Sequence, residues 1–228
     1  MSTLSDPSSA VRPAPLAEFV GTGVLAMVVT SSTFALAYYG QPAPGMQWLL
    51  AGAGAAAVVV VFGLLLPGVR LHPLVTLLDL RAGRVTVGAG AASILAQFLG
   101  GAVGNVLGFW TVLGVGGIEV STAGMTGAQV SDVLYAGAVA GLVIGLAVGL
   151  AARRRPDLLV PVIALASFAA AISADKLALG NPALVLGRIV GSTEVLTGLS
   201  PEQALLTIAG HLIGFVVALL LLPVLDRD

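Results

Sequence analysis

Long apolar stretches, separated by short segments that hold Pro, Gly or charged residues, dominate the sequence. A helix needs about 20 apolar residues to cross the hydrocarbon core of a membrane, because it rises about 1.5 Å per residue over roughly 30 Å. Six stretches are close to that length and end at such boundaries. We predict transmembrane helices over residues 16–39, 47–66, 87–112, 132–152, 158–174 and 201–223.

Two further apolar segments, residues 71–81 and 180–190, can form helices but are far too short to span a membrane. One follows the second long stretch and the other follows the fifth. Short interrupted segments at corresponding places in two halves of a membrane protein indicate half-helices that line a site. We therefore predict an all-α membrane protein with six transmembrane helices and two re-entrant half-helices. Three spans per half is an odd number, so the second half is an inverted repeat of the first.

Composition supports a membrane protein and argues against several other classes. Hydrophobic residues make up 57% of the 228 residues and charged residues only 9%, whereas a soluble domain carries about 25% charged residues. A formal net charge of −1 and the lack of a basic tract give no indication of nucleic-acid binding. There is no cysteine, only two histidines, and no carboxylate pair or nucleophile beside a base. We therefore expect no metal site, no cofactor and no enzymatic activity.

The basic residues predict the orientation, because Lys and Arg collect in cytoplasmic loops. With the N-terminus inside, two basic residues, Lys176 and Arg188, lie outside, and both termini are cytoplasmic. The Ser- and Pro-rich residues 1–15 are expected to form a disordered cytoplasmic tail, followed by a single transmembrane domain over residues 16–228. The basic residues on the cytoplasmic side are Arg12, Arg70, Arg81, Arg84, Arg153, Arg154, Arg155 and Arg227.

The two short segments begin with related tripeptides, His72-Pro73-Leu74 and Asn181-Pro182-Ala183. Each has the form of a helix start, because Asn is a good N-cap and Pro is favoured at the first helical position. The positive end of each helix macrodipole then points out of the helix start. Two such half-helices that meet at the membrane midplane would create a positive potential there, which disfavours cations while neutral molecules pass.

These motifs resemble those of the aquaporin, or major intrinsic protein, family. The second tripeptide keeps the family's Asn-Pro-Ala signature, and RLHPLVTL resembles its HLNPAVTL with His72 and Leu74 as replacements. AEFVGT from Ala17 and AQFLG from Ala96 resemble the family's first-helix AEFxGT and third-helix AQxxG, and GHLIG from Gly210 occupies the equivalent place in the sixth helix. The resemblance implies a homotetramer in the lipid bilayer, with one pore per subunit.

An internal duplication accompanies these motifs. Gln97 and His211 are 114 positions apart, and His72 and Asn181 are 109 apart. Similar offsets are expected if one half repeats the other with a few residues inserted. We assign the first repeat to about residues 16–112 and the second to about residues 132–223.

Selectivity in the family depends on an arginine directly after Asn-Pro-Ala and on aromatic or polar residues opposite it. Leu184 takes the place of that arginine, and the family's spacing brings Gly52 and either Ala169 or Ala170 to the opposite positions. None of these residues supplies the polar groups of a water-selective constriction. We therefore predict a wide filter that admits glycerol, urea or metalloid hydroxides.

Arg188 is a candidate replacement for the missing filter arginine. It follows Leu184 by four residues, on the same helix face and about 6 Å further outward, and helical side chains lean back toward the N-terminus. Its guanidinium could therefore reach the constriction. The alternative interpretation is an arginine at the outer membrane surface or one paired with Glu194 or Asp175.

His72 replaces asparagine in the first motif and is expected to cap its half-helix. One imidazole nitrogen can accept from a backbone amide while the other donates its N–H into the pore, and the positive helix end favours the neutral ring. Protonation would add a cation at the narrowest level, so a pH gate is one hypothesis. The other is a neutral histidine that holds the junction of the half-helices.

Glu18 lies within an apolar helix, where an unpartnered carboxylate is unfavourable. The resemblance implies that it accepts hydrogen bonds from the backbone of a half-helix loop. The matching position in the fourth helix is Gly137, so the second repeat lacks this carboxylate. Gln97 and His211 are expected to be structural supports at equivalent places of the two repeats.

We therefore predict a passive channel for small uncharged solutes, with water as a further candidate permeant. One alternative is a proton-coupled secondary transporter with broken helices, for which Glu18 and His72 are the candidate ionisable groups. Another is a member of the family with a closed pore and a structural role, because Leu74 is bulkier than alanine at the contact between the half-helices.

Overall fold

The computed structural model describes residues 15–38, 46–116, 130–173, 180–191 and 200–225, which are helical apart from short connections. The remaining residues, with most of the predicted tail, lie outside the described part of the chain. The helices are α1 (Pro15–Tyr38), α2 (Met46–Leu65), α3 (Pro73–Arg81), α4 (Val87–Gly116), α5 (Val130–Arg154), the 3₁₀ turn η2 (Pro156–Leu158), α6 (Leu159–Ser173), α7 (Pro182–Gly191) and α9 (Pro201–Leu225).

These helices lie where the hydrophobic pattern predicts them. The largest difference is at α4, which continues to Gly116, four residues beyond the predicted end at residue 112. Within the described residues, α1, α4, α5 and α9 contain stretches long and apolar enough to cross a membrane. Two shorter apolar helices, Leu49–Leu65 and Pro156–Ala169, accompany them. The apolar helices identify an integral membrane protein, whereas the full set of six spans stays a prediction.

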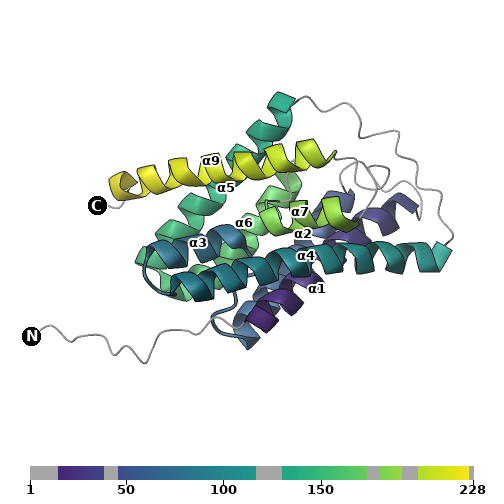
Figure 1. Cartoon of the computed structure of the whole chain (residues 1–228), viewed down its shortest axis with the longest axis horizontal. Helices are drawn as coiled ribbons and strands as arrows, with labels where there is room; N and C mark the ends of the chain where they lie inside the picture. Colours follow the sequence, from purple (N-terminus) through teal and green to yellow (C-terminus); the bar gives the residue numbers. More distant parts are fainter. Residues whose placement is uncertain (1–14, 39–45, 117–129, 174–179, 192–199, 226–228) are drawn as a thin grey trace, which may run out of the picture.

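Two helix pairs, α1 with α4 and α5 with α9, form the most extensive contacts of the bundle, and α2 packs against α6. Glycine allows this approach, since a Cβ on Gly104 would overlap the carbonyl oxygen of Gly23, and a Cβ on Gly214 would overlap that of Ala138. Small residues at crossings are typical of membrane helices, which associate by close packing. The short helix α7 lies between α4 and α9, whereas the short helix α3 packs against α4 and α5 (Figure 1).

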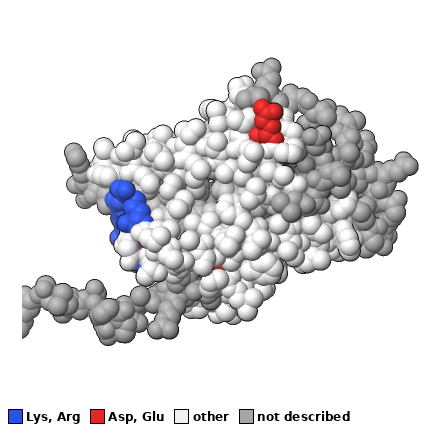
Figure 2. Space-filling view, in the orientation of Figure 1, with Lys and Arg blue, Asp and Glu red and all other residues white. Residues whose placement is uncertain are grey.

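The surface is uncharged over most of its visible area. Figure 2 shows Arg side chains at one end of the molecule and Asp or Glu side chains near the start of α5, with an uncharged band between them. On α4, exposed apolar side chains recur at four-residue spacing, at Leu95, Leu99, Val103 and Leu107. Such a band matches the apolar environment of lipid tails.

Candidate functional site

The helix starts of α3 and α7 have the caps that the tripeptides predict. His72 has an extended backbone (φ −150°, ψ 117°), and its Nδ1 accepts from the backbone N–H of Leu74 at 3.2 Å. In the other half, Asn181 Oδ1 accepts from the backbone N–H of Ala183 at 3.0 Å. Each cap side chain therefore bonds to the amide two residues later, with Pro73 or Pro182 in between.

The same two side chains also connect the starts of α3 and α7 to each other. His72 Nε2 donates to the carbonyl oxygen of Gly180 at 2.7 Å, and Asn181 Nδ2 donates to that of Leu71 at 2.8 Å. His72 Nδ1 accepts an N–H, so the hydrogen of the neutral ring is assigned to Nε2. Each cap thus bonds to the residue that precedes the other cap, and the two helix starts are held together.

This pairing corrects one prediction about His72. We expected its N–H to point into a pore, but the structure uses that N–H to bond Gly180. The imidazole has only two ring nitrogens, and both are occupied by backbone groups. The geometry is that of a histidine that holds the junction.

The residues before the two caps share an unusual backbone conformation. Leu71 has φ 56° and Gly180 has φ 64°, both in the left-handed region. Glycine adopts this region freely, whereas for other residues it costs about 1–2 kcal/mol. Among the described residues, Leu71 is the only non-glycine residue with a positive φ.

Glu18 of α1 holds this strained turn. One carboxylate oxygen accepts from the backbone N–H of Arg70 and the other from that of Leu71, each at 2.8 Å. Gln97 Nε2 of α4 donates to Glu18 at 2.9 Å and to Thr76 Oγ1 of α3 at 3.0 Å. The carboxylate is buried, so these donors replace the water that it loses.

Among the described residues of the predicted second repeat, no carboxylate holds the turn before Asn181 as Glu18 holds the turn before His72. The matching residue, Gly137 of α5, has no side chain and lies very close to α9. A Cβ at this position would overlap the carbonyl oxygen of Thr207. His211 is fully buried, and its Nδ1 donates to the carbonyl oxygen of Thr207 at 2.8 Å. Its Nε2 has no hydrogen-bond partner within the described part of the chain. Gln97 and His211 are therefore equivalent in sequence but differ in their contacts.

Two buried polar residues that the sequence analysis did not single out also fix the half-helices. Asn105 of α4 donates through Nδ2 to the carbonyl oxygen of Leu184 in α7 at 3.2 Å, and its Oδ1 accepts from the hydroxyl of Thr30 in α1. Asp79 of α3 is 3% exposed and pairs with Arg70 Nε at 2.6 Å and Arg84 Nε at 3.1 Å. Polar residues inside apolar helices were the signal that could have identified both.

Comparisons with known proteins agree with this geometry at the level of the fold. No protein-family model matches the sequence, and no curated protein matches it. Among solved structures, the X-ray structure of the aquaglyceroporin from Plasmodium falciparum matches with 19% identity over 96% of this chain and 100% of that chain, at a TM-score of 0.67. The chain has an aquaporin-like fold.

The structure describes the side-chain environment of only some of the residues that were expected to form a filter. Gly52 of α2 and Leu184 of α7 are buried, whereas Ala169 of α6 is exposed. Ala170 and Arg188 lie in α6 and α7, but their side chains are outside what the structure describes. The predicted filter and the position of the Arg188 guanidinium therefore stay predictions. No group of His, Asp and Glu suited to a metal ion occurs among the described residues.

Proposed function

We propose that this protein is a passive channel for small uncharged solutes. The observation that carries the proposal is the reciprocal bonding of the caps, in which His72 binds Gly180 and Asn181 binds Leu71. It holds the starts of α3 and α7 together, and each helix start carries about half a positive charge from its macrodipole. A positive potential at this point disfavours cations and leaves uncharged solutes as the permeant class.

The proposed arrangement in the membrane has six spans and two half-helices that enter from opposite faces. The aquaporin-like fold and the apolar helices support it. In this arrangement both termini and the arginine-rich loops are cytoplasmic, and four copies assemble with one pore each. The permeating solute passes the junction of α3 and α7, where His72 and Asn181 lie.

The junction offers a single amide donor to a solute in this proposal. Asn181 Nδ2 carries two hydrogens, and one of them bonds Leu71. His72 Nε2 carries one hydrogen, which bonds Gly180. A solute oxygen at this level can therefore accept from Asn181 alone.

We further propose a wide filter. Gly52 and Ala169 or Ala170 are small, and Leu184 offers no donor, so larger polyols and amides meet less steric resistance than at an aromatic constriction. Glycerol, urea and metalloid hydroxides are the solutes that fit. Arg188 is the candidate donor at this filter.

A closed pore is the second candidate, and burial at the junction favours it. Leu74 and Leu184 are 0% and 2% exposed, and His72 and Asn181 are 2% and 4% exposed. The contacts of Glu18 do not favour a proton-coupled transporter, because its carboxylate accepts two hydrogen bonds from the backbone of the turn and one from Gln97.

Stopped-flow light scattering of proteoliposomes distinguishes these functions. Vesicles that contain the purified full-length protein are exposed separately to sucrose, glycerol and urea gradients, with protein-free vesicles as the control. Glycerol or urea flux above the control supports the wide channel. Water flux without solute flux contradicts the wide filter, and no flux of either kind favours the closed pore.

A further inference from the structure

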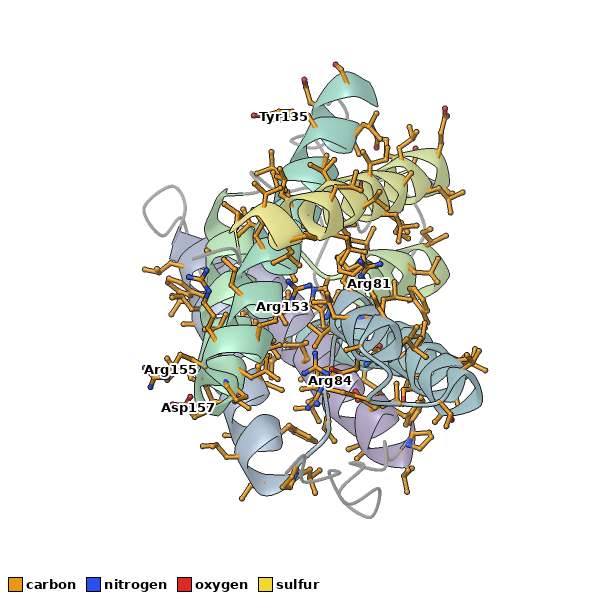
Figure 3. The ribbon with its side chains drawn as sticks, turned by 90° about the vertical axis from the view of Figure 1, so that its left-hand side faces the viewer. Arg81, Arg84, Tyr135, Arg153, Arg155 and Asp157 are labelled. Atoms are coloured by element: carbon orange, nitrogen blue, oxygen red, sulfur yellow. The ribbon has the colours of Figure 1, made fainter. Side chains whose placement is uncertain are left out.

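Arginine side chains gather at one end of the molecule. Figure 3 looks onto this end and shows Arg81, Arg84 and Arg153 toward its middle, whereas Arg155 and Asp157 lie at its edge. Arg81 ends α3, Arg84 follows it, and Arg153 lies in the last turn of α5. The positive-inside rule explains why arginines occur in such loops, but it requires no particular geometry among them.

Asp79 gives Arg70 and Arg84 a fixed geometry. It is buried, and its two carboxylate oxygens bind the Nε atoms of Arg70 and Arg84, while its carbonyl oxygen accepts from the backbone N–H of Arg84 at 2.9 Å. Binding through Nε leaves the terminal amino groups of both guanidinium groups without another partner among the described residues. Guanidinium groups that are held in place lose little freedom when they bind an oxyanion.

Arg81 adds a third cation between these two in the sequence. Its side chain is exposed, and it belongs to none of the ion pairs found among the described residues. By contrast, Arg155 at the edge is paired with Asp157 through Nε at 3.1 Å and Nη2 at 2.8 Å. Residues 70–84 thus carry three arginines and one aspartate, and the excess positive charge is unpaired in the described structure.

We propose that Arg70, Arg81 and Arg84, positioned by Asp79, form a binding site for a phosphate group. The tetrahedral phosphate oxygens accept several charge-assisted N–H bonds at once, and planar guanidinium groups donate them in pairs. A phosphate group reaches this end of a membrane protein either in a soluble phosphorylated compound or in a lipid headgroup. The site does not depend on whether the chain conducts solutes.

The first test uses the full-length protein in neutral detergent, with inorganic pyrophosphate as the probe and chloride at equal ionic strength as the reference. Isothermal titration should show binding that Arg81→Gln and Arg84→Gln each weaken by about tenfold or more, as expected for a lost charge-assisted bond. Arg155→Gln is the matched control, because it removes the same charge at the same end. Equal weakening by all three variants would show that binding depends only on the net positive charge of this end, and it would overturn the proposed site.

Asp79→Asn separates a positioned site from net charge. The change makes this end more positive, so a diffuse field predicts tighter pyrophosphate binding. If Asp79 positions the site, binding should instead become weaker, because Arg70 and Arg84 lose their ion pairs with the Asp79 carboxylate. If Asp79→Asn fails to fold, the exposed Arg81→Gln variant still decides the proposal.

A second arm identifies the source of the phosphate. The wild type and Arg81→Gln are placed in nanodiscs of phosphatidylcholine with or without phosphatidic acid, and pyrophosphate binding is measured in each. Competition by phosphatidic acid that depends on Arg81 identifies a lipid headgroup, and binding unaffected by that lipid identifies a soluble ligand. No Arg81-dependent binding of pyrophosphate or phosphatidic acid would overturn the proposal.

Discussion

Leu71 combines a strained backbone with a buried side chain, and the two effects act in opposite directions. Its left-handed conformation costs about 1–2 kcal/mol relative to a permitted region. Its side chain is 2% exposed and packs over Gly21, where a Cβ would overlap the Leu71 methyl group. Loss of a buried leucine side chain costs about 2–5 kcal/mol in protein cores, so packing outweighs strain.

We therefore expect Leu71→Gly to destabilise the protein, by about 1–3 kcal/mol, although it removes the backbone strain. Thermal unfolding of the purified protein in detergent measures the change. A melting temperature equal to or above that of the wild type would mean that strain, and not packing, dominates at this turn.

Glu18→Gln tests the hydrogen bonds that hold the same turn. A glutamine amide keeps one acceptor oxygen and replaces the other with a donor, so an N–H of Arg70, Leu71 or Gln97 loses its acceptor. The expected loss is about 1–3 kcal/mol of stability, together with reduced solute flux. The control is Glu202→Gln, the same change at an exposed position in the first turn of α9. If the two variants have the same melting temperature, the hydrogen bonds that Glu18 accepts do not stabilise the turn.

The individual residues show how far the sequence could predict the site. Glu18 was recognisable because a lone carboxylate in an apolar helix needs partners. The bond between Asn105 and Leu184, by contrast, depends on how α4 and α7 are placed in space. No local pattern in the sequence contains that information.

At the scale of the helices, the starts of α3 and α7 were predictable because Pro73 and Pro182 each follow a capping residue. Proline favours the first helical position and interrupts a continuing helix, so the sequence itself marks the boundary. The direction of the His72 N–H was predicted incorrectly, because the partner, Gly180, lies 108 residues away in the other repeat.

His72→Asn tests the junction between the half-helices. Asparagine can reproduce both bonds, as Asn181 does in the second half, and it carries one N–H more than the imidazole. We expect a folded protein with increased solute or water flux. Because both ring nitrogens of His72 are bonded, we also expect a flat flux profile between about pH 5 and 8 in the wild type. A profile that is steep in the wild type and flat in His72→Asn would establish a pH gate.

The contact between α4 and α7 depends on the absence of a side chain at Gly101. A Cβ there would overlap the carbonyl oxygen of Ala183, next to the second cap. We expect Gly101→Ala to displace α7 and reduce both stability and flux. The matched control, Gly88→Ala in the same helix, meets no atom within 4 Å and should be neutral or stabilising by up to about 1 kcal/mol. Equal effects of the two changes would rule out close packing as the cause.

At the scale of the whole molecule, the two predicted repeats contain similar helices, but the described hydrogen bonds that support their turns differ. The sequence predicted the order and approximate length of the helices, because the thickness of a membrane sets the length of an apolar helix. It could not predict that Leu71 and Gly180 share a conformation while Glu18 supports only the first of them. Those differences arise from contacts between helices, which the hydrophobic pattern does not specify.

The orientation that the arginines predict can be tested with single cysteines, because the sequence contains no cysteine. Ala82 lies at the arginine-rich end, directly after α3, and Ser131 lies in the first turn of α5; both are exposed. If arginines collect on the cytoplasmic side, a membrane-impermeant maleimide should label Ser131→Cys in intact cells and label Ala82→Cys only after permeabilisation. The reverse pattern would place the arginines outside. Labelling of both positions in intact cells would mean that the two ends do not lie on opposite faces of the membrane.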